Sequence, residues 1–527
     1  MFQHRPLLTV LGLVFMGISE TLAAPSKPNI VFILADDLGY GDVQALNPEG
    51  KIPTPHLNRL AASGMAFSDA HSSSSVCTPT RYGILTGRYN WRSRLPSGVL
   101  GGFSPTLIEE GRLTVPALLR SVGYTTACIG KWHLGLQWPL KPDAPAFTDK
   151  IEQGHDGWNA DFSKPFKNGP TALGFDYFYG IAASLDMVPY TFLENDHVTV
   201  VPTVDKDFPM TLGQGKGRTR RGPAAPDFEA DQVLPTLTAK AEAFIRSNAS
   251  KSKEGKPFFL YLPLNSPHTP IVPSQEWQGK SGISPYADFV MQTDASVGKL
   301  LDVLKAEGLD SNTLVFFTSD NGCSPSANFD QLAGFHHNPN FEFRGHKADI
   351  FEGGHRIPLL VSWPGRIAPG SKSAHLTCLN DFMATCAEII GEKLPDNAGE
   401  DSISLLPILE GRSDGPRRES LVHHSINGTF AIRKGSWKLE LCPDSGGWSN
   451  PRPRAPITKS LPKIQLYDLS KDVAENNNVQ TQHPEVVEEL IQLLEKIAVD
   501  GRSTPGPIQL NTGIIDLHRF DGKSKKN

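Results

Sequence analysis

Ile30-Val31-Phe32-Ile33-Leu34, followed at once by Ala35-Asp36-Asp37, is a short apolar run that ends in two carboxylates. Such a run is typical of a strand buried on both faces of a parallel sheet. Similar runs follow at residues 126–129, 258–262, 314–317 and 359–361, and helical patterns lie at 56–63, 114–122, 232–247 and 286–307. The alternation of strands and helices predicts an α/β sandwich with a mostly parallel sheet between helices.

The chain has 527 residues, which predicts a large domain and a smaller one. Residues 428–441 and 464–469 have the pattern of short antiparallel strands, and residues 484–498 that of one amphipathic helix. We therefore expect a catalytic domain over residues 25–414 and a C-terminal α+β subdomain with a short antiparallel sheet over residues 415–527.

Two segments rich in proline, glycine and charge, residues 137–170 and 195–230, are predicted to be long loops. In α/β folds such loops lie over the strand ends and shape the substrate site. The alternative is that they are surface insertions, and their position in the chain does not decide between the two.

The first 24 residues have the pattern of a secretory signal peptide. A basic start precedes the apolar run from Leu7 to Ile18, and small residues follow before Pro25. The run is shorter than the ~20 residues that span a bilayer, and no cysteine lies near the cleavage region. We expect an exported protein, periplasmic or secreted, with no membrane span. The net charge of -5 gives no support for a nucleic-acid partner.

Cys77-Thr78-Pro79-Thr80-Arg81, with Leu85-Thr86-Gly87-Arg88 shortly after it, is the strongest motif in the chain. Pro79 suits the first turn of a helix, which would place Cys77 at a helix N-terminus, where the dipole favours an anion. An isolated cysteine is more often a buried, inert thiol. The chain has five others, whose pairing is not predictable from sequence: Cys128, Cys323, Cys378, Cys386 and Cys442.

This motif resembles the signature C-x-P-x-R followed by L-T-G-R of the sulfatase family. The resemblance implies an alkaline-phosphatase-like fold and a maturation enzyme that oxidises Cys77 to formylglycine, an aldehyde. The hydrate of this aldehyde carries two hydroxyl groups on one carbon. One attacks the sulfur of a sulfate ester, and the other, once deprotonated, expels sulfate and regenerates the aldehyde. Arg81 would hold the nucleophile oxygen and the carboxylates on the metal side.

Polar residues also follow two of the predicted strands, Asp36-Asp37 after the first and Asp320-Asn321 after residues 314–317. The carboxyl ends of parallel strands lie side by side, so these groups can converge. Three carboxylates and one amide oxygen suit Ca²⁺, with Mg²⁺ second. Each pair alone is also typical of a turn or a helix cap. The family resemblance implies that they bind the metal together with residue 77.

The remaining predicted site residues follow the same resemblance. Gly130-Lys131-Trp132-His133-Leu134-Gly135 resembles the family's G-K-W-H-L-G and implies that Lys131 binds sulfate and that His133 takes a proton. His268, after the strand at 258–262, matches the histidine that protonates the bridging oxygen. Lys347 matches a second sulfate-binding lysine, which can share leaving-group protonation, and Ser184 a serine that bonds the sulfate.

We therefore expect a sulfuric ester hydrolase whose substrate is a sulfated carbohydrate. Two alternatives stay open at this point. One is a phosphodiester or phosphonate monoester hydrolase of the same fold. The other is a non-catalytic sulfated-glycan binding protein, which would arise if Cys77 is not modified. The segment 323–343, with His336 and His337, matches no motif and is either part of the pocket or an ordinary loop.

Overall fold

The computed structural model describes Met1 and residues 27–150, 154–213, 215 and 217–517. The predicted signal peptide, residues 1–24, lies outside the described residues apart from Met1 and stays a prediction. Within the described part of the chain, no helix combines the length and the apolar character needed to cross a membrane.

The core of the catalytic part is a ten-stranded sheet. In spatial order its strands are β13 (Ser371–Ser373), β2 (Met65–Phe67), β12 (Leu359–Ser362), β11 (Thr313–Ser319), β1 (Asn29–Asp36), β10 (Phe258–Pro267), β4 (Thr125–Lys131), β5 (Tyr177–Ile181), β6 (Leu193–Glu194) and β7 (His197–Val198). The five strands from β11 to β5 are parallel to one another. This confirms the mostly parallel α/β sheet expected from the apolar runs.

One strand was predicted in the wrong direction. Residues 359–361 form β12, but β12 runs antiparallel to both β11 and β2. Between β11 and β12 the chain forms the 3₁₀ turn Pro325–Ala327 and the short helices α6 (Phe329–Gly334) and α7 (Glu352–His355). It has no long crossover helix there and returns beside β11. A fully buried apolar run has the same sequence pattern in a parallel strand as in an antiparallel one. The sequence therefore does not predict the direction of such a strand.

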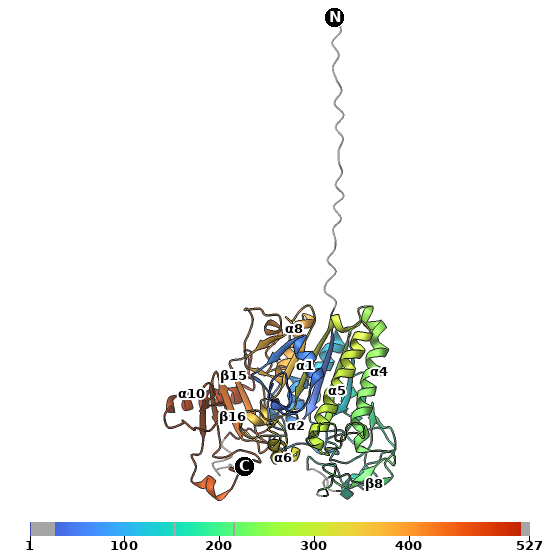
Figure 1. The fold of residues 1–527 in the computed structure, drawn as a ribbon, viewed down its shortest axis with the longest axis horizontal. Coiled ribbons are helices and arrows are strands. Elements are labelled where there is room, and N and C mark those ends of the chain that lie inside the picture. The colour runs from blue at the N-terminus through green and yellow to red at the C-terminus, as the bar shows by residue number, and fades with distance from the viewer. Residues whose placement is uncertain (2–26, 151–153, 214, 216, 518–527) are drawn as a thin grey trace.

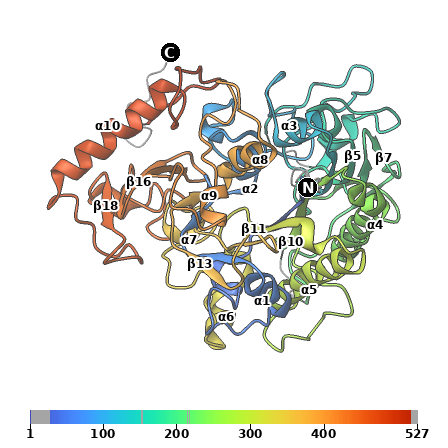
Figure 2. The ribbon, with the colours of Figure 1, turned by 90° about the horizontal axis from the view of Figure 1, so that it is seen from above.

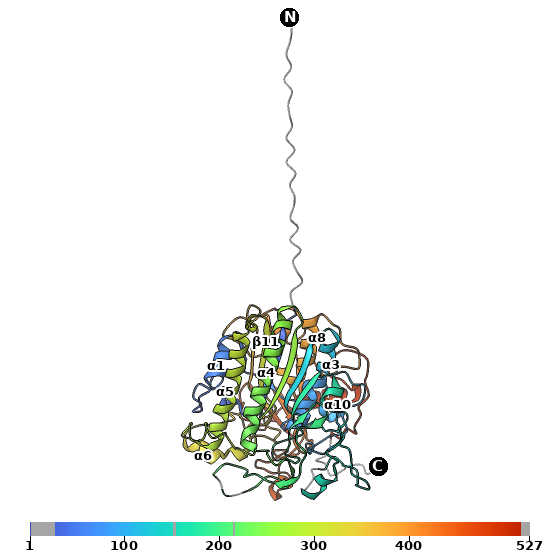
Figure 3. The same cartoon turned by 90° about the vertical axis from the view of Figure 1, so that its right-hand side faces the viewer.

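Helices cover both faces of the sheet (Figure 2). One face carries α1 (Pro55–Ala62), α4 (Val233–Lys253) and α5 (Pro285–Ala306), and the other carries α2 (Cys77–Thr86), α3 (Val115–Ser121) and α8 (Phe382–Ile390). Phe382 of α8 packs on the second face, with its ring centroid 4.5 Å from that of Phe32 and 5.3 Å from that of Phe316. In Figures 1 and 3 the carboxyl ends of the central strands face the loop-rich lower end, where α6 lies.

The C-terminal part forms a second layered unit beside the first (Figure 1). Its antiparallel sheet contains β15 (Ser420–His424), β16 (Phe430–Lys434), β17 (Trp437–Glu440) and β18 (Gln465–Asp468). Helix α10 (Pro484–Asp500) buries Leu490, Leu494 and Ile497 beside it. The small α+β unit matches the expectation in kind, and the boundary at 414/415 stays a prediction.

The predicted loops contain little regular structure. Residues 137–170 include the 3₁₀ turns Gly154–Asn159 and Pro170–Leu173 at their end, and residues 195–230 include β7, β8 (Val204–Lys206) and β9 (Gly222–Ala224). Two further short strands, β3 (Ala70–His71) and β14 (Thr377–Cys378), pair with each other near α2.

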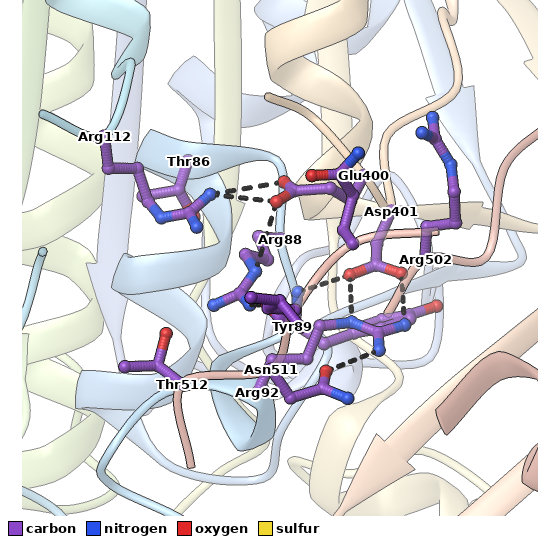
Figure 4. Close-up of polar contacts among 12 residues, drawn as sticks. Thr86, Arg88, Tyr89, Arg92, Arg112, Glu400, Asp401, Arg502, Asn511 and Thr512 are labelled. Carbon is purple, nitrogen blue, oxygen red and sulfur yellow. Dashed lines mark hydrogen bonds and ion pairs between the residues drawn. The ribbon is translucent and has the colours of Figure 1, made fainter. Parts of the chain in front are cut away.

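The chain after α10 returns to the catalytic part and closes over the turn that follows α2 (Figure 4). Arg88 donates from Nη2 to the carbonyl oxygen of Leu510 at 2.7 Å. The backbone carbonyl oxygen of Arg92 accepts a hydrogen bond from the backbone N–H of Thr512 at 2.8 Å. The guanidinium of Arg92 binds both carboxylate oxygens of Asp401, at 2.8 and 2.9 Å. The helix that carries Cys77 is therefore fixed at its far end by buried, paired charges.

Gly87 ends α2 in the left-handed conformation, with φ +63°, and a Cβ there would lie 2.8 Å from Cα of Gly399. We expect Gly87→Ala to lower the free energy of unfolding by about 2–4 kcal/mol, from backbone strain and overpacking. Gly98 has φ +74° but open space around it, so Gly98→Ala should cost only the strain, about 1–2 kcal/mol. Urea unfolding of the two variants checks this, and equal losses would contradict the packing contribution.

Candidate active site

Cys77 is the first residue of α2, directly after the extended residue Val76. Pro79 occupies the first turn of the helix, as the sequence predicted. The side chain is buried, with 2% of the residue exposed. Burial raises the pKa of the Cys77 thiol to about 12, although Lys131 and Lys347 act in the opposite direction. The unmodified side chain is therefore a protonated thiol at neutral pH and a poor nucleophile.

The two strand ends meet as the topology predicted. β1 and β11 pair with Ala35 opposite Ser319, which places Asp36 and Asp37 beside Asp320. The backbone N–H of Asp37 donates to Oδ1 of Asp320 at 3.2 Å, and Asp37 itself has φ 64°. The carboxylates of Asp36 and Asp37, the sulfur of Cys77 and a ring nitrogen of His268 all lie within 4.8 Å of one another. Residue 77 is thus within reach of both aspartates.

The donor set at these strand ends fits a hard divalent cation. Asn321 donates from Nδ2 to Oδ1 of Asp37 at 2.8 Å, which leaves its amide oxygen for another partner. Among the residues that the structure describes, neither Oδ1 of Asn321 nor Oδ1 of Asp36 has a hydrogen-bond partner, although both atoms are buried. Buried oxygens of this kind are normally satisfied, and a Ca²⁺ ion would satisfy them.

Three buried cations surround the carboxylates. Arg81 donates from Nη2 to Oδ2 of Asp320 at 2.8 Å, Lys131 from Nζ to Oδ2 of Asp36 at 2.6 Å, and Lys347 from Nζ to Oδ2 of Asp37 at 2.7 Å. This is the group of fixed positive charges that an anionic substrate and its transition state require.

These cations and carboxylates set one another's protonation. Burial alone would raise the pKa of Asp36, but Lys131 and its neighbours outweigh burial and hold that pKa well below its usual range. Burial and the nearby charge of Asp36 raise the pKa of Asp320 to about 7 despite Arg81. Three carboxylates crowd one small volume, and a divalent cation would relieve their repulsion.

His133 follows β4 with φ 57°, and its Nε2 lies 2.8 Å from the carbonyl oxygen of Leu100. A carbonyl can only accept, so Nε2 carries the hydrogen and Nδ1 is left with its lone pair. Nδ1 is buried and has no hydrogen-bond partner among the described residues. Burial, together with Lys131 and Arg81, holds the pKa of His133 well below its ordinary value. The ring is therefore a neutral base with one free nitrogen.

His268 follows β10 and reaches the same carboxylates. Its Nδ1 lies 2.6 Å from the carbonyl oxygen of Thr269, and its Nε2 lies 3.6 Å from Oδ2 of Asp37. Burial and the charge of Lys347 lower the pKa of His268. Because the Thr269 carbonyl takes the Nδ1 hydrogen, Nε2 is the nitrogen that faces the site.

Ser184 lies in the loop after β5, one strand away from His133. The backbone N–H of His133 donates to the carbonyl oxygen of Ala182 at 3.0 Å, which draws this loop alongside. Ser184 is 2% exposed, and its Oγ has no hydrogen-bond partner within the described part of the chain. The loop is therefore near the predicted site, and contact of Ser184 with sulfate stays a prediction.

The role of His337 in supporting the turn after Asp37 was not predicted from the sequence. His337 is buried, and its Nε2 lies 2.8 Å from Oδ1 of Asp42, whereas His336 is exposed. The hydroxyl of Tyr286 donates to Oδ2 of Asp42 at 2.6 Å, and the N–H of Gly39 donates to the same oxygen at 2.8 Å. His337 is therefore a structural support behind the predicted metal ligands, a role that no local sequence pattern signals.

The six cysteines are all buried and all free. No disulfide links the two parts of the chain within the described residues.

The fold and the site together define a hydrolase of anionic esters: a parallel sheet with a cluster of carboxylates, cations and neutral imidazoles at its carboxyl edge. The chain belongs to the sulfatase family, because the Sulfatase family model matches residues 28–392. It is therefore a hydrolase that acts on sulfate esters, and the resemblance inferred from the motifs is confirmed.

Relatives are similar in sequence to this chain over most of its length. An N-acetylgalactosamine-6-O-sulfatase of Bacteroides thetaiotaomicron is 34% identical over 517 residues, covering 89% of this chain and 93% of that protein. Arylsulfatase A of Homo sapiens is 33% identical over 518 residues, covering 95% and 94%. A structure solved in work on the metabolism of multiple glycosaminoglycans by Bacteroides thetaiotaomicron is similar with a TM-score of 0.75 and 33% identity, covering 90% of this chain and 99% of that one.

Proposed function

We propose that the protein removes sulfate from a sulfated carbohydrate, with a formylglycine derived from Cys77 as the nucleophile. A carbohydrate substrate is supported by the relative named N-acetylgalactosamine-6-O-sulfatase and by the similar structure from work on glycosaminoglycans. The partners implied are the sulfated sugar and a formylglycine-generating maturation enzyme. The N-terminal sequence pattern supports export to the periplasm or the medium.

One observation carries this proposal: Cys77 lies within 4.8 Å of the oxygens of Asp36 and Asp37 and a ring nitrogen of His268. A thiol with a pKa of about 12 is unsuited to attack at neutral pH. When present, formylglycine supplies a hydrated aldehyde with two hydroxyl groups on one carbon, which allows attack and later release of sulfate without a second attack by water.

Asp36, Asp37, Asp320 and Asn321 would hold the cation, for which we propose Ca²⁺ rather than Mg²⁺ because the donor set is all oxygen and supplied by the protein. The ion would polarise a sulfate oxygen and the nucleophile oxygen as a Lewis acid.

The remaining residues bind the anion and move protons. Lys131 and Lys347 hold the sulfate oxygens, and Arg81 orients Asp320 and the start of α2. Nδ1 of His133 accepts a proton, since its other nitrogen is committed to the Leu100 carbonyl. His268 can donate from Nε2 only as an imidazolium, a form that an anionic ester beside it favours, and Lys347 can share this task.

The neutral state of His133 leads to a pH prediction. A base must be deprotonated, so activity is lost as the pH falls through the pKa, and the pKa of His133 lies below 6.5. Because His133 acts in the release of sulfate, after the ester bond has been cleaved, we expect the acidic limb of the kcat profile to have its midpoint below pH 6.5, measured with an aryl sulfate. His133→Gln should abolish this limb and reduce kcat by about 10²- to 10⁴-fold. An acidic limb centred above pH 6.5 would contradict the assignment.

The experiment that tests the function is a comparison of substrates. Purified protein is assayed with an aryl sulfate, a panel of sulfated monosaccharides and oligosaccharides, and an aryl phosphodiester, with Cys77→Ala as the blank. Turnover of sulfate esters above the blank supports the proposal. Turnover of the phosphodiester alone would refute it.

A further inference from the structure

The loop predicted over residues 195–230 contains a hairpin that contacts the loops of two predicted site residues, His268 and Ser184. The N–H of Thr219 donates to the carbonyl oxygen of Phe208 at 2.9 Å, and this pairing defines the hairpin between residues 208 and 219. On one side, Leu212 donates its N–H to the carbonyl oxygen of Ile271 at 3.0 Å, three residues after His268. Just beyond the other arm, Arg220 donates its N–H to the carbonyl oxygen of Asp186 at 3.2 Å. The hairpin therefore lies between the loop of His268 and the loop of Ser184.

Where the hairpin meets the loop of Ser184, Asp186 and Arg220 form an ion pair. Nη1 of Arg220 donates to Oδ2 of Asp186 at 2.7 Å and to its carbonyl oxygen at 3.2 Å. The hydroxyl of the buried Tyr190 donates to Thr219 at 2.8 Å and fixes the hairpin beside the pair. The Arg220 side chain is 30% exposed and that of Asp186 is 15% exposed. Part of each side chain is therefore exposed to solvent.

The second carboxylate oxygen of Asp186, Oδ1, does not take part in the bond to Arg220. Oδ1 is buried and has no hydrogen-bond partner among the described residues, as is also true of Oγ of Ser184 two positions earlier. A desolvated carboxylate oxygen without a donor is unfavourable, and such atoms in a folded protein call for a partner. A hydroxyl group of a bound ligand would supply such a donor.

The buried ion pair of Arg92 and Asp401 has a different pattern. In the buried pair of Arg92 and Asp401, both carboxylate oxygens accept hydrogen bonds from the guanidinium, and one also accepts the N–H of Tyr89 (Figure 4). Asp186 instead leaves one oxygen available, and only one terminal nitrogen of Arg220 is used in its side-chain bond. The pair therefore offers an acceptor and a donor side by side.

We propose that Asp186 and Arg220 form a subsite that binds two neighbouring hydroxyl groups of the sugar that carries the sulfate. Asp186 accepts a hydrogen bond from one hydroxyl through Oδ1, and Arg220 donates to the other. The pair is neutral overall, so it suits the uncharged part of the substrate, whereas Lys131 and Lys347 bind the sulfate. This inference rests on the proposed function and names the residues that select a carbohydrate over an aryl sulfate.

The test compares Asp186→Asn with the wild-type protein on two substrates, N-acetylgalactosamine 6-sulfate and an aryl sulfate. Asparagine keeps the shape and removes the charge-assisted acceptor. We expect kcat/KM for the sugar sulfate to fall about 10- to 100-fold, and for the aryl sulfate less than about threefold. The matched control is Asp207→Asn, at the base of the same hairpin, where Asp207 pairs with Arg218 and Arg221 instead of Arg220. This control should leave both values unchanged.

Equal losses on the two substrates would show a structural role and overturn the proposal, as would an unchanged value for the sugar. A wild-type protein that turns over the aryl sulfate but none of the sulfated sugars in the panel would also overturn it. If Asp186→Asn fails to fold, monodeoxy analogues assayed with the wild-type protein replace it, and loss of one recognised hydroxyl should lower kcat/KM at least about tenfold. If neither substrate is turned over above the Cys77→Ala blank, the failure lies in the proposed function.

Discussion

Cys77→Ala is expected to reduce kcat for sulfate esters by about 10⁵-fold or more, because it removes the nucleophile itself. The fold should survive, since the methyl group of alanine fits the buried start of α2 and Asp36, Asp37 and Asp320 keep their contacts with Lys131, Lys347 and Arg81. Initial rates with an aryl sulfate measure the loss, and urea unfolding shows that the variant is folded.

The matched control for this substitution is Cys386→Ala. Cys386 is also a fully buried free thiol in a helix, α8, but the pKa of its thiol is raised by burial alone, with no charged group beside it. This variant should lose some stability through its smaller side chain and keep its kcat. A Cys77→Ala protein with wild-type kcat would refute the mechanism.

The second large effect is expected at Asp37, in the proposed metal site. Asparagine tolerates the left-handed conformation that Asp37 adopts, so Asp37→Asn removes the charge with little change in the backbone. We expect the purified variant to lose the bound divalent cation and kcat to fall about 10³-fold or more, since a Lewis acid contributes several kcal/mol. Metal content by elemental analysis and aryl sulfate turnover are the two measurements.

Asp143 provides the control for that exchange, because it is an exposed aspartate that also has a positive φ, 60°. Asp143→Asn should retain both the cation and kcat. Wild-type protein treated with a chelator should regain activity with added Ca²⁺ more completely than with Mg²⁺. Full activity of Asp37→Asn without bound metal would contradict the assignment of the site.

The fold was predictable to the extent that it depends on buried strands. The runs at 30–34, 126–129, 258–262 and 314–317 all lie in parallel strands, and the carboxyl ends of parallel strands share one edge. That geometry allowed Asp36, Asp37 and Asp320 to converge, and the family resemblance led us to expect that they do. The direction of β12 was not predictable, because it depends on the path of the connection.

The site was predictable where side chains carry the chemistry and unpredictable where the backbone does. The bond from His133 to the carbonyl oxygen of Leu100, 33 residues away, decides which nitrogen is the base. Every residue has such a carbonyl, so no residue type signals this one. The pairing of Asp186 with Arg220 likewise depends on how the hairpin folds back, and two charged residues in a loop resemble any solvated pair.

The measurement that tests the central claim most directly is the mass of the tryptic peptide 60–81 from protein that turns over an aryl sulfate. We predict a peptide lighter than the cysteine form, because oxidation of the thiol to an aldehyde removes the sulfur. A fully active preparation in which this peptide carries only unmodified cysteine would contradict it.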